Sequence, residues 1–494
     1  MLFNSVDFLI FFPIVVFIYF IIPKKIRFIW LLITSYYFYM CWNVKYVLLL
    51  ILSTVTTWLA GLIINACKQT LGKKCAVAGC VFVNLGILVF FKYLDFLYDI
   101  CNRILSTFHM QIAEKSFDIL LPVGISFYTF QALGYIVDVY RGRVRPEGNI
   151  LRYALFVSFF PQLVAGPIER SENLLQQVRE VDKKQIWNYE NVTDGLILMV
   201  WGLFVKMVIS DRAAILVNTV FDNFYMYGTV SLVAGAIGFA LQIYCDFMGY
   251  SVIAMGAARV MGFQLMENFN TPYFARSISD FWKRWHISLS TWFQDYVYIP
   301  LGGSRCSKGR KYFNLMVTMG ISGLWHGASW SFVAWGILHG LYQVVGDATK
   351  RIRQSAYARW KVKTESFSFQ LAQIVSTFLL VDFAWIFFRA ESIGLALDYC
   401  KRIFTRWDPW SLFNGEIYTL GLDRMEFNIL VVSLVVLFLT DLLRYFKKET
   451  ITDFLKKQCI WFRWSVVILL IGAILVYGIY GIKFESSQFI YFQF

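Results

Sequence analysis

Residues 323–330 read Gly323-Leu324-Trp325-His326-Gly327-Ala328-Ser329-Trp330. They lie near the middle of an apolar run, residues 313–345, that contains no Asp, Glu, Lys or Arg. A histidine is costly to hold in hydrocarbon, and ionisable groups inside membranes usually serve a function. We therefore expect His326 to lie in a protein-lined cavity as a functional residue; the alternative is a structural histidine bonded to a neighbouring helix.

Basic clusters flank both ends of this run. They consist of Arg305, Lys308, Arg310 and Lys311 before it, and Lys350, Arg351, Arg353, Arg359, Lys361 and Lys363 after it. Because Lys and Arg collect on the cytoplasmic side of a membrane, a single span with two basic ends is unfavourable. The pattern predicts a broken or re-entrant pair that enters from the cytoplasm and returns to it, with Gly320, Gly323 and Gly327 loosening the backbone at the turning point.

The composition is that of a polytopic membrane protein. Of the 494 residues, 58% are hydrophobic and 16% are charged, whereas soluble domains carry about 25% charged residues. The net charge of +14 lies largely in short loops between apolar runs, where positive-inside orientation explains it, so we expect no nucleic-acid partner. The nine cysteines show no Cys-x-x-Cys or Cys/His spacing, and no metal site is predicted.

The apolar runs predict about ten full crossings and two re-entrant elements. The crossings are residues 8–22, 28–42, 46–64, 76–91, 119–139, 192–220, 230–258, 371–388, 427–443 and 465–482. The run around His326 is one re-entrant element, and residues 155–166 are the other, because they are short and interrupted by prolines and glycine. The placement of the basic loops predicts a multi-pass cell-membrane protein with both termini extracytoplasmic. Pro122 and Gly124 are expected to bend the crossing at 119–139.

A second histidine falls in a predicted interfacial amphipathic helix over residues 279–293. Its apolar face would carry Trp282, Trp285, His286, Leu289, Trp292 and Phe293, with Asp280, Lys283 and Arg284 on the other face. His286 would thus be buried, and Pro300-Leu301-Gly302-Gly303 would end this region with a turn.

The chain has only four histidines. His109 lies in a polar loop and is expected to be solvated, while His339 is expected to be a packed structural residue. The sequence offers no Gly-x-Ser-x-Gly, no Cys/His constellation and no Gly-rich phosphate loop. A histidine acting directly as general base on an acceptor hydroxyl fits this inventory. The rival hypothesis is a proton- or ion-coupled transporter, because three acidic residues lie at or within apolar segments: Asp138, Asp246 and Asp382.

Three phrases resemble the membrane-bound O-acyltransferase (MBOAT) family, in its bacterial alginate O-acetyltransferase-like branch. They are Phe281-Trp282-Lys283-Arg284-Trp285-His286-Ile287-Ser288-Leu289-Ser290, Asp295-Tyr296-Val297-Tyr298-Ile299-Pro300-Leu301-Gly302-Gly303-Ser304-Arg305 and Gly323-Leu324-Trp325-His326-Gly327-Ala328. Shorter matches at residues 1–5, 122–127, 164–167 and 491–494 extend the resemblance over essentially the whole chain. The chain departs from the family pattern at Met248 and Val252, where a small residue and often a polar or acidic one would be expected.

The resemblance implies an all-α ring of about ten transmembrane helices plus re-entrant elements around a central funnel. It implies one integral-membrane domain over residues 1–494, which we divide into N-terminal helices (1–145), a catalytic core with re-entrant elements (146–370) and C-terminal helices (371–494). It implies that His326 is catalytic and that His286 lines the same site. Further candidates for donor or acceptor binding are Trp325, Trp282, Trp285, Lys283 and Arg284, the last two through the donor's phosphates.

The implied activity is transfer of an acyl group, with acetyl favoured, from a cytoplasmic thioester across the membrane for O-acylation of a cell-surface polysaccharide. The thioester would be acetyl-CoA or an acyl carrier protein as co-substrate, and no bound cofactor is expected. The implied partners are membrane lipid, the polysaccharide acceptor and an extracytoplasmic protein of the SGNH-hydrolase type. D-alanyl transfer to teichoic acid, performed by another branch of the family, is one alternative; a transporter or flippase of a surface-polymer precursor is the other.

Overall fold

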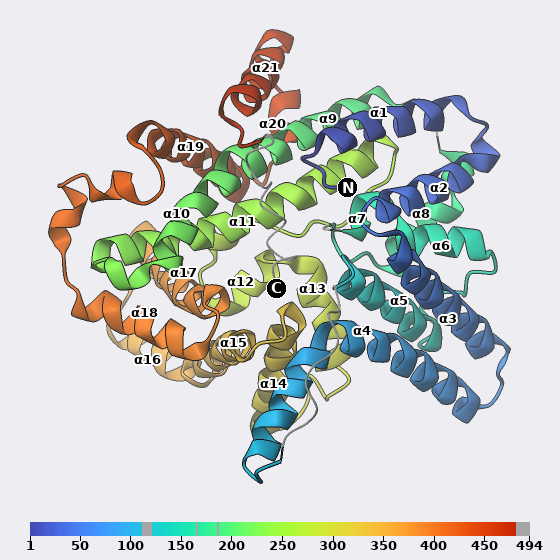
Figure 1. Ribbon diagram of the computed structural model, residues 1–494, viewed down its shortest axis with the longest axis horizontal. Helices are drawn as coiled ribbons and strands as arrows, with labels where there is room; N and C mark the ends of the chain where they lie inside the picture. The colour runs from blue at the N-terminus through green and yellow to red at the C-terminus, as the bar shows by residue number, and fades with distance from the viewer. Residues whose placement is uncertain (111–120, 165, 185–186, 481–494) are drawn as a thin grey trace. The chain divides into compact units, whose positions relative to one another are not determined.

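A computed structural model describes residues 1–110, 121–164, 166–184 and 187–480. Every regular element within these ranges is a helix, and the ranges contain no β-strand (Figure 1). Within the described ranges, seven helices are long and apolar enough to cross a membrane. The prediction of an all-α polytopic membrane protein is therefore confirmed.

Seven of the ten predicted crossings coincide with these seven helices. The helices are Val44–Ala66, Thr70–Ser106, Tyr189–Asp222, Thr229–Val260, Phe367–Arg389, Arg424–Lys447 and Ile460–Tyr477. The other three predicted crossings correspond to α1 (Val6–Ile21), α2 (Arg27–Met40) and α5 (Ile125–Tyr140), which have 14 to 16 residues. Because an untilted span needs about 20 residues, the count of ten crossings is not confirmed. Parts of two predicted crossings, residues 119–120 and 481–482, and the C-terminus lie outside the described residues.

The helix α5 starts later than the sequence suggested. Gly124 is its N-cap, with a φ of 74° in the left-handed region, so Pro122 and Gly124 precede the helix and do not bend it. The predicted re-entrant segment 155–166 contains two short helices, α6 (Ile150–Ser158) and α7 (Phe160–Leu163). Neither is long enough to cross alone, and their re-entrant insertion stays a prediction.

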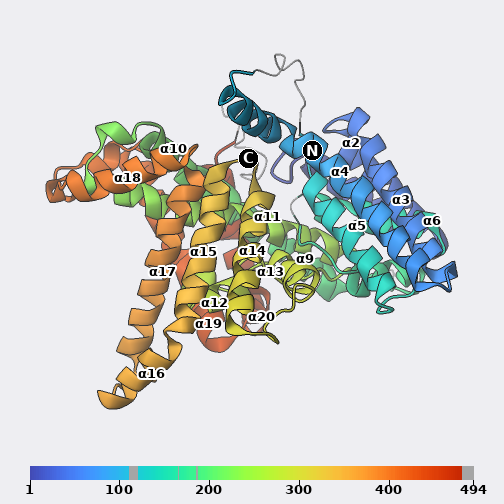
Figure 2. The ribbon, with the colours of Figure 1, turned by 90° about the horizontal axis from the view of Figure 1, so that it is seen from below.

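The chain forms two compact units, the first made of Met1–Met199 and Ser251–Met266. Its helices are α1 (Val6–Ile21), α2 (Arg27–Met40), α3 (Val47–Ala66), α4 (Thr70–Ser106), α5 (Ile125–Tyr140), α6 (Ile150–Ser158), α7 (Phe160–Leu163) and α8 (Gln176–Arg179). In this unit α3 packs against α4 and α5 (Figure 2). Long helices α9 (Tyr189–Phe204) and α11 (Thr229–Val260) contribute to both units.

The second unit comprises Val200–Tyr250 and Glu267–Phe494 and carries both candidate histidines. Its helices include η5 (Val205–Ser210), α10 (Asp211–Asp222), η7 (Pro272–Phe274), α12 (Ile278–Arg284), α13 (Ile287–Phe293), η8 (Gln294–Tyr298), α14 (Lys308–His326), α15 (Trp330–Ala348), α16 (Lys350–Arg359), α17 (Phe367–Arg389), α18 (Ile393–Thr405), α19 (Arg424–Lys447), α20 (Ile451–Lys456) and α21 (Ile460–Tyr477). This division does not test the predicted single domain or its boundaries at residues 145 and 370, which stay predictions.

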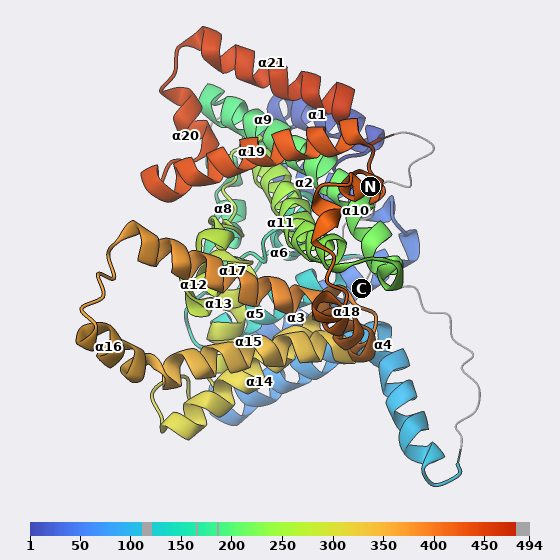
Figure 3. The ribbon, with the colours of Figure 1, turned by 90° about the vertical axis from the view of Figure 1, so that its left-hand side faces the viewer.

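The run around His326 forms a helical hairpin. The helices α14 and α15 lie side by side, and α14 ends at His326 just before the turn (Figure 3). At the opposite end, Lys311 Nζ of α14 lies 2.8 Å from Asp347 Oδ2 of α15. The start of α14 and the end of α15, with their basic flanks, therefore meet at one end of the hairpin, as the charge pattern predicted.

Glycines bring the two helices of the hairpin into backbone contact. A Cβ on Gly323 would lie 2.2 Å from the Phe332 carbonyl oxygen, and one on Gly336 would lie 2.3 Å from the Met319 carbonyl oxygen. Gly327 lies in the turn, where a Cβ would meet the Phe332 ring at 2.2 Å. Gly320 and Gly323 are inside α14, so the prediction that they loosen the turn is wrong: Gly323 allows close packing, and nothing lies within 4 Å of a Cβ on Gly320.

Three charged residues within the spans form a buried cluster in the second unit. Lys206 lies 2.7 Å from Asp211 and also pairs with Asp246 of α11, and all three side chains are almost completely buried. Mutual pairing is what makes such charges tolerable away from water. Asp246, counted above in favour of a transporter, is therefore engaged in an ion pair inside the fold.

Candidate active site

His286 lies at a sharp break in the chain, which the sequence did not predict. The expected continuous helix over residues 279–293 is wrong: α12 ends at Arg284 and α13 begins at Ile287. His286 itself has φ 42° and ψ 56°, the left-handed conformation that a residue with a Cβ adopts only at some cost. Such outliers persist where the surroundings impose them, often at functional sites.

Asn268 is the residue that imposes this break. Its backbone carbonyl accepts from the Ile287 N–H at 2.9 Å. Its side-chain Oδ1 accepts from the hydroxyl of Ser288 at 2.6 Å and from the Ser288 backbone N–H at 3.4 Å. Asn268 is itself buried. The extended segment before α12 therefore holds residues 286–288 by hydrogen bonds that replace those of a continuous helix.

The same amide sets the tautomer of His286. Because a backbone N–H can only donate, the bond from Ser288 identifies Oδ1 of Asn268 as the acceptor oxygen of its amide. His286 Nδ1 lies 3.3 Å from this oxygen and must then carry the ring proton. Complete burial lowers the pKa of His286 to about 3. The ring is therefore neutral at neutral pH, with the lone pair on Nε2.

His326 occupies the last position of α14, inside an aromatic cage. Its ring lies 5.0 Å from that of Trp335 and 5.2 Å from that of Phe388, centroid to centroid. Only 3% of His326 is exposed. The carboxyl end of a helix carries partial negative charge, and His326 lies at that end of α14.

Trp325 connects the two histidines. Its ring lies 5.9 Å from the ring of His286 and 5.0 Å from that of His326, edge to face in both cases. The structure thus brings together His286, Trp325 and His326, which come from two segments about 40 residues apart in the sequence. The ring of Phe247 of α11 also packs against that of His286, edge to face, with 4.5 Å between centroids.

Trp282 and Trp285 form an aromatic layer next to this group. The indole N–H of Trp282 donates to His339 Nδ1 at 3.3 Å, and the Trp282 ring meets that of Trp335 at 5.7 Å. Trp285 is fully buried and packs on Trp385 at 5.1 Å. Both tryptophans support the site through packing, and His339 is buried as a partner of Trp282.

The structure separates Lys283 from Arg284. Arg284 is paired with Asp280 at 2.9 Å and lies over the Tyr445 ring, away from the hairpin. Lys283 instead lines a cavity of about 300 Å³ together with Trp282 and residues of α13, α14 and α15. We call this cavity the lysine pocket.

The lysine pocket extends from the basic end of the hairpin toward the histidines. Lys283, Lys311 and Asp347 line it, as do Ser322 and Leu289. Ser322 lies one helical turn before His326 on α14, and Leu289 lies one turn after His286. The pocket therefore approaches the two histidines from the end of the hairpin that carries the cationic residues.

The sequence did not predict several of the residues that surround the two histidines. Asn268 lies 18 residues before His286 in a stretch without helical periodicity, so nothing in the pattern marks it. Phe388 and Trp335 cage His326 from α17 and α15, where aromatic residues are too common to stand out. His109, in contrast, is exposed, as expected, and it belongs to the first unit.

The sequence was compared with protein-family models and with known proteins, and both comparisons gave matches. The model of the MBOAT, membrane-bound O-acyltransferase family matches residues 144–381. The chain is 36% identical to the "Probable alginate O-acetylase AlgI" of Pseudomonas aeruginosa, over 91% of this chain and 83% of that protein. It is 35% identical to the "Peptidoglycan O-acetyltransferase" of Helicobacter pylori, over 76% of this chain and 73% of that protein. The "Teichoic acid D-alanyltransferase" of Bacillus subtilis is a more distant relative, 27% identical over 57% of this chain and 72% of its own.

Proposed function

This chain belongs to the membrane-bound O-acyltransferase family, and from that premise we propose that it moves an acetyl group from a cytoplasmic thioester toward hydroxyl groups of a cell-surface polysaccharide. The observation that carries the proposal is the buried group His286, Trp325 and His326, approached by the lysine pocket. Relatives named as acetylases of alginate and peptidoglycan support both the acetyl group and the polysaccharide class of acceptor.

His326 is the proposed general base. It takes the proton of the acceptor hydroxyl as that oxygen attacks the thioester carbonyl carbon. The carbon–sulfur bond then breaks, and the leaving thiolate receives the proton from the imidazolium. The position of His326 at the carboxyl end of α14 stabilises this imidazolium, and the cage of Trp335 and Phe388 limits access of water to it.

His286 is proposed to orient the donor. Stabilising an oxyanion would need a proton on Nε2, whereas the bond to Asn268 keeps the proton on Nδ1 and burial disfavours a second one. A neutral ring with its lone pair on Nε2 accepts a hydrogen bond. It would thus hold a hydroxyl or an amide N–H of a substrate near Trp325.

The lysine pocket is the proposed entry for the donor. Lys283 supplies positive charge to the pocket, beside the ion pair of Lys311 with Asp347, and this charge suits the phosphates of coenzyme A or of a carrier protein's prosthetic arm. Coenzyme A titrated into the purified protein should quench tryptophan fluorescence, since Trp282 lines the pocket. Lys283→Gln should weaken this binding several-fold and Arg284→Gln should not. Failure of coenzyme A to bind would favour a carrier protein as donor.

The acceptor side of the reaction calls for a second protein. We propose an extracytoplasmic partner of the SGNH-hydrolase type that completes transfer to the polymer, with both termini of this chain extracytoplasmic. Protease accessibility of tags at either end in intact cells would test the topology, and co-purification after crosslinking would test the partner.

The decisive experiment measures esters released by mild base from cell surfaces, resolved into acetate and D-alanine. Wild-type, deletion, His326→Ala and His109→Ala strains are compared at matched protein levels. We expect equal loss of acetate in the deletion and His326→Ala strains and none in His109→Ala. Loss of D-alanine would instead indicate the reaction of the teichoic-acid relatives. Unchanged esters in all strains would refute the transferase proposal and favour transport of a precursor.

A further inference from the structure

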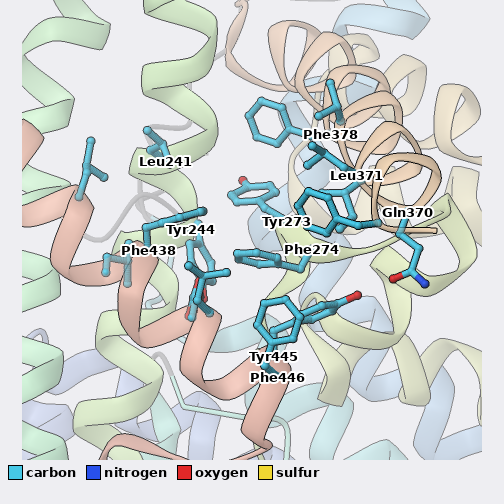
Figure 4. A pocket seen from close by; sticks show the side chains of 17 residues that line it. Leu241, Tyr244, Tyr273, Phe274, Gln370, Leu371, Phe378, Phe438, Tyr445 and Phe446 are labelled. Atoms are coloured by element: carbon cyan, nitrogen blue, oxygen red, sulfur yellow. Dashed lines mark hydrogen bonds between the residues drawn. The ribbon is translucent and has the colours of Figure 1, made fainter. Parts of the chain in front are cut away.

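A large apolar groove lies in the second unit, outside the site described above. It has a volume of about 520 Å³ and is lined by α17 and α19, with α11 and the segment before α12 forming its floor. Figure 4 shows Leu371 and Phe378 of α17 across the groove from Phe438 of α19, with Tyr244, Tyr273 and Phe274 between them. Among the described residues, Asp441 is the single carboxylate in the lining, and it accepts a hydrogen bond from the Tyr244 hydroxyl at 3.0 Å.

The groove opens toward the face that the spans turn to the membrane. Its lining includes Phe367, Phe438 and Phe446, which are 72%, 54% and 68% exposed in the protein alone. Both α17 and α19 are candidate membrane spans. Exposed apolar side chains on a span face lipid, so hydrocarbon and not water surrounds the opening.

One end of the groove is cationic. Three arginines lie there, and two of them are neutralised: Arg284 by Asp280, and Arg444 by Glu267. Arg276 is exposed, its Nε donates to the hydroxyl of Tyr445 at 3.0 Å, and no carboxylate pairs with its guanidinium among residues 1–110, 121–164, 166–184 and 187–480. Tyr445 and Phe274, stacked at 5.2 Å, line the groove beneath it. Of these three arginines, Arg276 thus stands at the mouth of a hydrocarbon-lined channel with no carboxylate partner on its guanidinium among the described residues.

We propose that this groove binds one molecule of an anionic phospholipid from the cytoplasmic leaflet. An acyl chain lies along α17 and α19, and the phosphate rests on Arg276 and the hydroxyl of Tyr445. The leaflet follows from charge, because α19 carries Arg444 and Lys447 in its last turn and is followed by Lys448, and the segment before α17 carries Lys361 and Lys363. A zwitterionic headgroup satisfies this end less well, because it brings no net charge to the unpaired arginine.

The bound lipid contacts the layer that supports His286. Tyr244 and Tyr273 form the inner wall of the groove, and their rings lie 6.2 Å and 6.0 Å from that of Trp285. Trp285 immediately precedes His286 at the break in the chain. Occupancy of the groove therefore stabilises the segment that carries His286, whatever group the enzyme transfers.

Native mass spectrometry of the purified full-length protein tests the site directly, with phosphatidylglycerol and phosphatidylcholine added in separate titrations. We expect phosphatidylglycerol to be retained at least fivefold more strongly. Arg276→Gln should remove most of this preference, and Arg351→Gln, an exposed arginine on α16, should leave it intact. Ile374→Trp, which fills the groove, should abolish retention of both lipids, whereas Leu379→Trp on the lipid-facing surface of the same helix should not.

Three results would overturn the proposal. Equal retention of the two lipids would show that no site selects the anionic headgroup. Retention that Ile374→Trp leaves unchanged would show that the lipid does not bind in the groove. Displacement of phosphatidylglycerol by undecaprenyl phosphate at equal concentration would assign the groove to a polyprenyl carrier instead. None of these readouts depends on transfer activity, so they stand or fall apart from the ester measurement above.

Discussion

Replacing Asn268 by leucine tests whether one amide controls both the shape and the chemistry of the site. The variant keeps a similar volume but removes Oδ1, the acceptor shared by His286 Nδ1–H and by the hydroxyl and N–H of Ser288. A hydrogen bond contributes about 0.5–1.5 kcal/mol, and a buried donor left without an acceptor costs about 1–3 kcal/mol. The Ser288 hydroxyl can rotate to another acceptor, but the other two donors are fixed. We therefore expect a loss of stability of about 2–6 kcal/mol, from about 1–3 kcal/mol for each of these two donors.

The loss of activity should exceed what instability explains. Without Oδ1 the ring of His286 can carry its proton on either nitrogen, and residues that orient a functional histidine in this way typically contribute about 10- to 100-fold, judged from metal sites. The assay compares ester content per folded protein, measured by size-exclusion chromatography and thermal unfolding in detergent. Asn268→Asp keeps an acceptor oxygen and should recover more activity than the leucine variant. If Asn268→Leu formed esters at the wild-type level per folded molecule, the argument about the tautomer would be wrong.

Three further predictions rest on single contacts. Because burial lowers the pKa of His286 from 6.5 to about 3, the unfolded chain binds one more proton than the folded chain between these pH values. The contribution of neutral His286 to the free energy of unfolding should be fully present above pH 6.5 and fall by about 2 kcal/mol by about pH 5. Thermal unfolding at the two pH values should show this loss in the wild type and not in His286→Gln. Gly323→Ala forces a methyl group against the Phe332 carbonyl oxygen and should destabilise the protein by about 3 kcal/mol or abolish expression. The control variant Gly320→Ala should raise stability by up to about 1 kcal/mol. Equal melting temperatures for the two variants would contradict the close backbone contact between α14 and α15. Lys206→Met removes the cation that pairs with two buried carboxylates and should lower the free energy of unfolding by about 3–5 kcal/mol. The triple variant that adds Asp211→Asn and Asp246→Asn should recover most of this stability. If it did not, Lys206 would have a role beyond pairing.

The sequence predicted the hairpin well because its signal is local. An uncharged run with basic residues at both ends has few arrangements in a membrane, and the pair between Lys311 and Asp347 is the arrangement expected. The seven long spans were equally visible, since length and hydropathy alone identify them. The association of His286 with His326 came only through family resemblance and now rests on the ring contacts of Trp325.

What the sequence could not reveal depends on distant partners. Helical periodicity over residues 279–293 is real, yet hydrogen bonds from Asn268 override it and turn His286 out of the helix. Lys283 and Arg284 are separated because successive residues of a helix point about 100° apart: Lys283 faces the hairpin, and Arg284 pairs with Asp280 and lies over Tyr445. The cage around His326 is built by α15 and α17, which no local pattern connects to it.

The clasp between Lys311 and Asp347 bears on how the protein is made. The charge pattern predicts that both ends of the hairpin lie on the cytoplasmic side, and in that topology the insertion machinery never has to carry these cationic clusters through the bilayer. In this topology the uncharged turn, residues 327–329, would enter the bilayer first, together with His326. We expect α14 and α15 to enter as one unit once Asp347 has emerged from the ribosome, with the glycine crossing closing as they enter. The most polar part of the site would thus reach the interior of the membrane already wrapped in its partner helix.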